Sequence, residues 1–205
     1  GDIRTSEEGI SSINNRIADM YIDCTGFRSI LMKKLYVKFL SYNDMLPNNK
    51  AWATRVPYKV KSLELRPYTN CTAIENGWVW NIPSWERIGT GYVYSDRYVD
   101  DEQALEEFKR HLDGRGSDYS QSEFKNISMR VGRHEKLFVK NVCAIGLSAG
   151  FIEPLESNGL LSVHEFLINL VKVMKRGDKL SQWDRDNFNM ESCRFFDEFT
   201  DFFFF

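Results

Sequence analysis

The sequence lacks closely spaced cysteines, and this absence excludes the common cysteine-based sites. Its only cysteines are Cys24, Cys71, Cys143 and Cys193, and no two of them are closer than 47 residues. A structural zinc site or a redox dithiol needs cysteines only a few residues apart. We therefore expect four reduced thiols, as in a cytoplasmic protein, and no bound metal.

Histidine is scarce as well, and membrane signals are missing. The three histidines, His111, His134 and His164, do not have the spacing of metal ligands, so none is assigned a role. The sequence has no signal peptide and no apolar run near the roughly 20 residues that a membrane helix needs. A cytoplasmic location with no membrane partner is expected.

Neither sign of charge dominates the chain. It contains 27 basic and 29 acidic residues, which are mixed along the sequence and give a formal net charge of -2. Such a balance provides no electrostatic reason to bind nucleic acid or an anionic membrane. Small-molecule partners are favoured.

The ends of the sequence predict a fragment of a longer protein. The chain opens without an initiator methionine and closes on four consecutive phenylalanines, 202–205. With 205 residues, of which 42% are hydrophobic, it has material for one ordinary core or part of a larger one. Function is therefore argued for a parent protein, and the fragment alone is expected to be inactive.

The first third of the chain predicts short strands. Two apolar runs flanking Asn14-Asn15 indicate a small hairpin, because asparagine tolerates left-handed backbone geometry. Residues 20–24 are expected to form a strand, and 27–31 have helical character. The pattern from 33 to 65 is weak, with a short strand at 52–56.

Clearer patterns follow from residue 68 onward. Residues 68–95 indicate an antiparallel meander, with a turn at Glu75-Asn76-Gly77. The remaining expected elements are an exposed helix at 101–112 ended by Gly114, strands at 125–131 and 137–145, a helix at 157–174 and one or more helices after Gly177. The 157–174 helix is so apolar that it should be largely buried.

The segment 144–161, AIGLSAGFIEPLESNGLL, joins an expected strand to this apolar helix. Gly146, Ala149 and Gly150 permit close approach of a flat ligand to the backbone. The first-turn amides of the helix, from residues 158–160, form a concavity the size of an anion, with Glu156 beside it. The alternative is an ordinary turn with a capped helix.

Four segments together resemble the FAD-dependent tryptophan halogenases. They are GLSAGFIEPLESNGL at 146–160, WVWNIP at 78–83, RIGTGYVYS at 87–95 and YIDCTGFRSIL at 21–31. WVWNIP fits the pattern WxWxIP, which separates these halogenases from related flavin monooxygenases. Four segments in one order form a more specific signal than any one alone.

The resemblance implies roles for individual residues. Glu156 would be the acidic catalytic residue, with Ser157 shaping the site. The amides of Asn158 and Gly159 would hold the halide. The better-known tryptophan halogenases have threonine where this sequence has Asn158, which puts the halide preference in doubt. The expected cofactor-binding residues are Gly146, Leu147, Ala149, Gly150 and Leu160. The expected wall between flavin and substrate consists of Trp78, Trp80, Ile82 and Pro83.

The resemblance also implies the chemistry. FADH2 supplied by a separate flavin reductase would react with O2 to a flavin hydroperoxide, and attack by halide would give hypohalous acid. This acid would halogenate tryptophan or a related indole or other aromatic compound. Glu156 could take the proton from the halogenated ring, a role that suits a partly desolvated carboxylate. A homodimer is left open.

The implied fold is mixed α/β (α+β), a Rossmann-like FAD/NAD(P)-binding flavoprotein of the monooxygenase and halogenase type, with an antiparallel sheet on the substrate side. Its expected parts are 1–32 in the FAD-binding domain, 33–128 on the substrate side, 129–175 back in the FAD-binding domain and 176–205 starting a helical region. The GxGxxG dinucleotide unit and the catalytic lysine are missing and should precede residue 1. The alternatives are a flavin-dependent aromatic monooxygenase and a truncated non-catalytic remnant.

Overall fold

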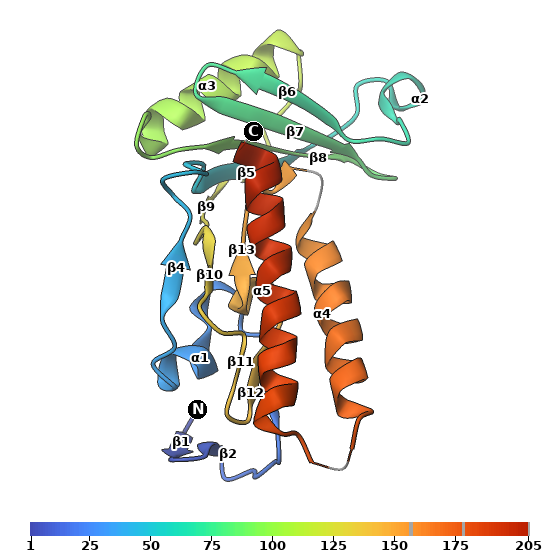
Figure 1. The fold of residues 1–205 in the computed structure, drawn as a ribbon. Coiled ribbons are helices and arrows are strands. Elements are labelled where there is room, and N and C mark those ends of the chain that lie inside the picture. The colour runs from blue at the N-terminus through green and yellow to red at the C-terminus, as the bar shows by residue number, and fades with distance from the viewer. Residues whose placement is uncertain (156–157, 178, 205) are drawn as a thin grey trace. The chain divides into compact units, whose positions relative to one another are not determined.

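Residues 1–155, 158–177 and 179–204 are described by a computed structural model of the chain (Figure 1). The chain divides into two compact units, one made of residues 1–46 and 130–205 and the other of residues 47–129. Both contain helices and sheets, which confirms the mixed α/β class.

The first unit begins with the hairpin of β1 (Ile3–Ser6) and β2 (Gly9–Ile13). The predicted turn at Asn14-Asn15 is confirmed, because both residues have positive φ and an isolated bridge joins Ile13 to Arg16. The paired strands of the main hairpin nevertheless lie before this turn.

Two small three-stranded sheets form the centre of this unit. One contains β3 (Tyr21–Asp23), β12 (Val142–Ala144) and β11 (Phe138–Val139), with β3 and β12 parallel. The other, entirely antiparallel, contains β4 (Phe39–Ser41), β10 (Gly132–His134) and β13 (Gly150–Phe151). Between β3 and β4 lie the 3₁₀ turn η1 (Gly26–Arg28) and helix α1 (Ile30–Lys34).

The prediction of a single strand at 137–145 is wrong. The chain reverses within it and pairs β11 with β12, Phe138 opposite Cys143. Lys140 at the turn has φ of 55°, a left-handed conformation that lysine seldom adopts. The turn is Lys140-Asn141, and its single asparagine is a weak turn signal in the sequence.

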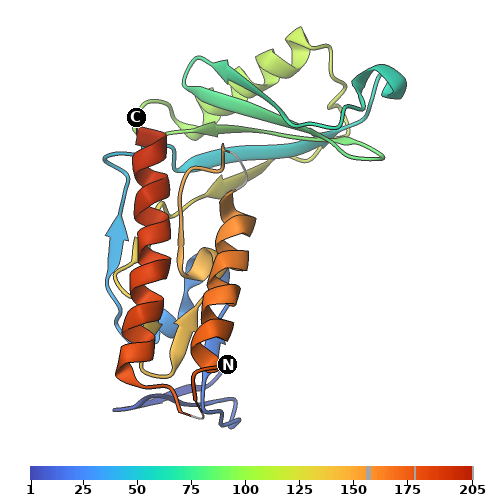
Figure 2. The ribbon, with the colours of Figure 1, turned by 45° about the vertical axis from the view of Figure 1, so that its right-hand side comes forward.

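Two long helices complete the first unit, α4 (Asn158–Met174) and α5 (Gln182–Phe204), which lie side by side in Figures 1 and 2. Phe166 of α4 packs edge-to-face against Phe188 and Phe196 of α5. The expectation that α4 is largely buried is wrong, because α5 covers only one of its sides. Its exposed large apolar residues are Leu160, Leu161, Leu167, Ile168, Val171 and Met174.

The second unit is built on a five-stranded antiparallel sheet (Figure 1). Its spatial order is β6 (Asn70–Ile74), β7 (Gly77–Pro83), β8 (Ile88–Tyr94), β5 (Lys50–Val56) and β9 (Lys125–Ser128). The predicted meander is confirmed as β6, β7 and β8, with Glu75-Asn76 as a two-residue turn between paired Ile74 and Gly77. The weakly predicted strand at 52–56 is a full strand between β8 and β9. A short helix, α2 (Lys61–Glu64), precedes the meander.

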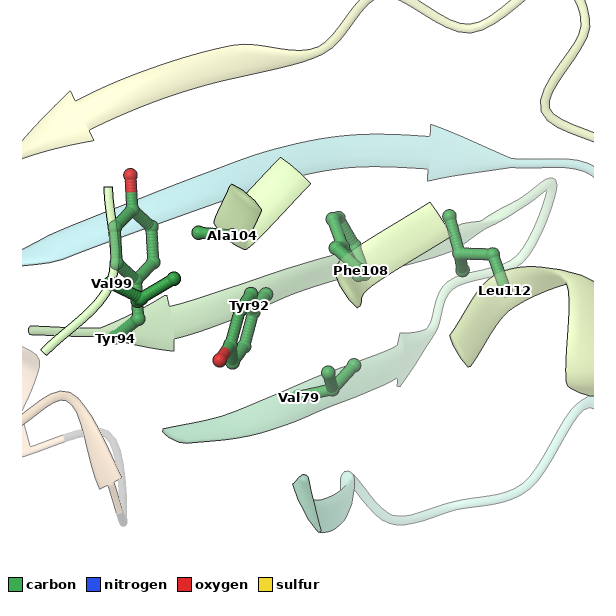
Figure 3. Packing of buried hydrophobic residues seen from close by; sticks show 7 residues of the cluster. All are labelled: Val79, Tyr92, Tyr94, Val99, Ala104, Phe108 and Leu112. Carbon is green, nitrogen blue, oxygen red and sulfur yellow. The ribbon is translucent and has the colours of Figure 1, made fainter. Parts of the chain in front are cut away.

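The apolar core of this unit lies between the sheet and α3 (Asp101–Gly114). Figure 3 shows its buried residues: Val79, Tyr92, Tyr94, Val99, Ala104, Phe108 and Leu112. The helix at 101–112 was expected to be exposed, but one face of it is buried on the sheet. Asp100 caps this helix by accepting a hydrogen bond from the Gln103 amide at 2.8 Å. No helix in the described parts of the chain is both long enough and apolar enough to cross a membrane.

Candidate active site

The sequence predicted that the segment 144–155 joins a strand directly to α4, and this prediction is wrong. After β12 the chain forms the 3₁₀ turn η2 (Gly146–Ser148) and then β13. Gly150 of β13 pairs with Arg133 of β10, so a strand of the second small sheet comes before the helix. A Cβ at Gly150 would lie 2.6 Å from the Gly132 carbonyl oxygen, which explains the glycine.

The turn at Gly146 is compact and closed by its own hydrogen bond, with a side chain of α4 close by, since a Cβ at Gly146 would lie 3.3 Å from Val163 Cγ2. Gly146 has φ of 69°, which favours glycine, and the Ala149 amide donates to the Gly146 carbonyl at 2.9 Å. Leu147, between them, is 39% exposed, whereas Ala149 is fully buried. Of the predicted cofactor-binding residues in this turn, Leu147 is exposed and Gly146 is half-buried, whereas Ala149 and Gly150 are buried.

The start of α4 is only partly described. Glu156 and Ser157, the predicted catalytic residues, lie outside the described residues. Asn158 is the first residue of α4, and a side chain added at Gly159 would meet nothing within 4 Å. Leu160 is 78% exposed. Open space at Gly159 and exposed leucines at 147 and 160 leave room for a cofactor or an anion, so these residues fit the ligands implied by the resemblance.

Asp23 organises the segment YIDCTGFRSIL, which precedes and includes the start of α1. Its carboxylate is fully buried, and one oxygen accepts from the amides of Leu31 at 2.8 Å and Met32 at 3.1 Å. The other oxygen accepts from the Thr25 amide at 3.0 Å and the Thr25 hydroxyl at 2.6 Å. The buried charge is thus satisfied by four donors, and it fixes the chain between β3 and α1.

Ser29 and Ser148 connect this segment to the Gly146 turn. The Ser29 hydroxyl donates to the Ser148 carbonyl at 2.8 Å, and both serines are fully buried. The Ser148 hydroxyl contacts the carbonyls of Asp23 and Ile145. Two of the segments that carry the family resemblance are therefore joined by side-chain bonds to the backbone.

Arg130 and His134 lie beside this connection, and no sequence pattern pointed to a role for either. Arg130 Nη2 donates to Ser29 Oγ at 2.5 Å, and its guanidinium lies 4.0 Å from the centre of the Phe39 ring. His134 Nδ1 lies 3.2 Å from the Val37 carbonyl. Burial and the charge of Arg130 lower the pKa of His134, which favours the neutral imidazole. Its Nε2, 3.5 Å from Arg130 Nη2, is then left as an acceptor.

The predicted wall residues lie in the other unit, on β7. Trp78, Trp80 and Ile82 point to the sheet face opposite Val79 and the core, because side chains alternate along a strand. The two indoles make an edge contact with centres 6.2 Å apart, which confirms that they share one side. Pro83 ends the strand, and Ile82 is 45% exposed.

The Trp80 ring lies over a glycine of the neighbouring strand. A Cβ at Gly91, which pairs with Trp80, would be 2.2 Å from the indole ring and 2.6 Å from the Trp52 carbonyl oxygen. At Gly89 on the same face, an added Cβ would meet only the Ile82 carbonyl oxygen at 3.9 Å. Gly91 is therefore required for the position of Trp80, whereas Gly89 is not.

No group of three or more histidine, cysteine, aspartate or glutamate residues that could hold a metal occurs among the described residues. His111 lies in α3, His134 in β10 and the exposed His164 in α4.

Comparison with known proteins identifies the family. The tryptophan halogenase family model matches residues 9–205. Tryptophan 6-halogenase SttH from Streptomyces toxytricini is 44% identical over 161 residues, covering 78% of this chain and 30% of SttH. Tryptophan 7-halogenase RebH from Lentzea aerocolonigenes is 37% identical over 207 residues, covering 98% of this chain and 38% of RebH.

Solved structures agree on the fold. The crystal structure of SttH superposes with a TM-score of 0.88 at 37% identity, covering 98% of this chain and 42% of that one. These similarities confirm the FAD-binding halogenase fold, and the chain belongs to the tryptophan halogenase family. The chain spans between 30% and 38% of the length of SttH and RebH.

Proposed function

We propose that this chain forms part of a flavin-dependent halogenase that halogenates tryptophan or a related indole. The observation that carries the proposal is the family match over residues 9–205, which includes both WVWNIP and the segment from Gly146 to Leu160. Because the chain covers a minority of its relatives' length, activity is proposed for a longer polypeptide that contains it.

The flavin would bind at the backbone of the turn after β12 and at the start of α4. The residues proposed to hold it are Gly146, Leu147, Ala149, Gly150 and Leu160. When bound and reduced, the flavin together with O2 supplies the oxidising power that converts halide to hypohalous acid. The chain's own contribution is a left-handed glycine turn at Gly146 with the exposed Leu147 beside it, where a flat ring system can lie.

The amides of Asn158 and Gly159 would hold the halide at the start of α4. The first amides of a helix have no intrahelical partner and carry the positive end of its dipole, so they attract anions. The open space at Gly159 supports this role, because an anion can approach the backbone there without meeting a side chain. A backbone contact tolerates Asn158 in place of threonine, although the identity of the favoured halide can change.

Glu156 would act as the base that removes the proton from the halogenated ring, and Ser157 would shape the site around it. A carboxylate in a partly desolvated site has a raised pKa, which suits proton transfer near neutral pH. Trp78, Trp80, Ile82 and Pro83 would separate flavin from substrate and keep water away from the reactive acid.

Several further assignments belong to the same proposal. Residues 1–32 and 129–175 would contribute to the FAD-binding domain, 33–128 to the substrate side, and 176–205 to the start of a helical region. A separate reductase would supply reduced flavin, and the enzyme would work in the cytoplasm, as a monomer or as a homodimer.

The test uses the full-length enzyme that contains this sequence. It is incubated with a flavin reductase, NADH, one halide at a time and a panel of indoles, and products are identified by mass spectrometry. A halide-dependent mass increase on an indole is expected, and Glu156→Gln should abolish it while flavin binding is kept. A hydroxylated product formed without halide, or no product across the panel, would overturn the proposal.

A further inference from the structure

Arg130 is a half-buried cation that makes hydrogen-bond contacts with neutral side chains and also feels the charge of the Asp23 carboxylate. Its Nη2 donates to the Ser29 hydroxyl at 2.5 Å and lies 3.5 Å from His134 Nε2. Its Nε is buried and has no hydrogen-bond partner among the described residues. Burying a guanidinium with few hydrogen bonds costs free energy of folding. A neutral residue would avoid this cost, so the charge or the donors of Arg130 are expected to have a specific role.

The bond to Ser29 has a fixed direction. Arginine is a donor only, so the Ser29 oxygen must accept from Arg130. The single hydroxyl hydrogen of Ser29 is then free to donate, and its nearest acceptor is the Ser148 carbonyl at 2.8 Å rather than the Gly26 carbonyl at 3.5 Å. Arg130 therefore orients the hydroxyl that holds Ser148.

The backbone of Ser29 gives a second indication that this position is specialised. Ser29 has φ of 42°, a left-handed conformation that is unfavourable for residues other than glycine, and it is fully buried. Strain of this kind persists where the surrounding structure demands it. Glycine would relieve the strain but would lack the hydroxyl that bridges Arg130 and Ser148.

The Ser148 carbonyl belongs to the turn proposed to contact flavin. Because a peptide group is planar, fixing this carbonyl also fixes the Ala149 amide, which donates to the Gly146 carbonyl at 2.9 Å. The Ser148 hydroxyl is held separately, against the carbonyls of Asp23 and Ile145. The carbonyl and the hydroxyl of Ser148 are thus both held in place. This also restricts the position of the exposed Leu147, which precedes Ser148 in the turn.

We propose that Arg130 is a positioning residue for the turn Gly146–Ala149, acting through the Ser29 hydroxyl to set the backbone that receives the flavin. The inference rests on the proposed function for the identity of the ligand. It assigns a positioning role to Ser29, which lies in the segment 21–31, and to Arg130, which lies outside all four segments that carry the resemblance.

The test measures FAD binding to the full-length enzyme by quenching of flavin fluorescence, without halide or substrate. Arg130→Met and Ser29→Ala are each expected to weaken FAD binding about tenfold, the effect typical of losing a supporting partner of a binding group. Arg130→Lys keeps the charge and one donor and should lie in between. If Arg130→Met does not fold, Arg130→Lys replaces it in every comparison.

A double-mutant cycle separates action through Ser29 from a general loss of structure. If Arg130 works through the hydroxyl, the double variant Arg130→Met/Ser29→Ala should bind FAD no more weakly than the worse single variant. Asp197→Ala is the matched control, because it removes the ion pair between Asp197 and Arg133 in the same unit. Among the described residues, the Asp197 side chain has no bond to the turn Gly146–Ala149. This variant should lower the melting temperature but leave the FAD dissociation constant within about twofold.

The inference is overturned if the effects of the two single variants multiply, if Arg130→Met leaves FAD binding unchanged, or if Asp197→Ala weakens binding equally. These outcomes do not depend on halogenation. A wild-type enzyme that binds FAD but yields no halogenated indole would remove the proposed function and leave the positioning role standing. A wild-type enzyme without measurable FAD binding would remove both.

Discussion

The two compact units satisfy their backbone hydrogen bonds in different ways. In residues 47–129, five strands of four to seven residues form one continuous antiparallel sheet. In the other unit, the strands of the described residues are only two to five residues long and are divided among three small sheets. Short strands leave many amides and carbonyls without a neighbouring strand, and buried ones need other partners.

Side chains take the place of missing strands in the first unit. The Asn141 amide bonds both the N–H and the C=O of Ile10, each at 2.9 Å. The Asn189 amide accepts from Leu137 and Phe138 at 2.8 and 2.7 Å and donates to the Phe138 carbonyl at 2.9 Å. The first unit therefore depends on a few specific polar residues, whereas the second depends on its backbone ladder and apolar core.

The largest expected effect comes from removing a core aromatic residue of the second unit. Phe108 is fully buried and contacts Tyr92 and Phe124. Phe108→Ala should cost about 3–5 kcal/mol of unfolding free energy, because it leaves a cavity beneath the sheet. Hydrogen exchange of amides in residues 47–129 measures this loss. Leu105→Ala on a less buried part of α3 is the control, and equal effects of the two would contradict the importance of the core.

The two units also differ in how far their structure could be predicted from the sequence. The meander was predictable because Asn76-Gly77 marks a hairpin and aromatic residues fill the strands. In the first unit, the β11–β12 turn falls on Lys140-Asn141, whose single asparagine is a weak turn signal, and β13 has only two residues. The pairing of β12 with β3 and of β13 with β10 joins segments far apart in the chain, which single-sequence patterns do not reveal.

The same reasoning applies to the candidate site. The roles assigned to residues between Gly146 and Leu160 come from the resemblance of that segment to a known family, and they stay predictions. Arg130 lies outside the four segments. Although Ser29 lies inside one of them, no local pattern links it to Ser148, 119 positions away, or to Arg130, 101 positions away. Supporting residues of this kind become visible only when the fold brings them together.

The second prediction concerns the side chains that replace strands. Asn189 is 8% exposed, and Asn189→Ala would remove the oxygen to which the amides of Leu137 and Phe138 donate. Because each buried unsatisfied group costs about 1–3 kcal/mol, a total loss of about 2–4 kcal/mol is expected in chemical denaturation. Asn141→Ala should cost roughly half as much, since Asn141 is less buried and water can replace it. A negligible loss for Asn189→Ala would show that the short strands need no such support.

The third prediction tests how β8 accommodates the half-buried indole of Trp80 on the sheet face opposite the core. Gly91→Ala should cost about 1–3 kcal/mol and shift the Trp80 indole, because the new Cβ meets both the ring and the backbone of β5. Gly89→Ala is the matched control on the same strand and face, and its effect should stay below about 1 kcal/mol. Unfolding measurements give the energies, and tryptophan fluorescence reports the ring. Equal effects at both glycines would contradict the inference that Trp80 packs directly over Gly91.

The smallest expected effect is a pH-dependent change in the stability of the first unit. There, Asp197 of α5 forms an ion pair with Arg133 of β10. Arg133 Nε and Nη2 donate to its carboxylate at 2.9 and 2.8 Å, and the Tyr42 hydroxyl donates at 2.6 Å. Burial disfavours the charged form of Asp197, but the bonds from Arg133 and Tyr42 outweigh it and lower its pKa. Burial and Asp197 itself raise the pKa of Tyr42, so the phenol remains a donor.

A carboxyl group whose pKa is lower in the folded state stabilises the fold above its unfolded pKa of about 4, and this contribution is lost as the pH falls further. Since the Asp197 side chain is 49% exposed, solvent screening limits the contribution to about 1 kcal/mol. Asp197→Asn should therefore destabilise α5 at pH 7 and much less at pH 3. Hydrogen exchange of α5 amides at the two pH values measures the difference. An equal destabilisation at both would mean that hydrogen-bond geometry, rather than the charge of Asp197, attaches the helix.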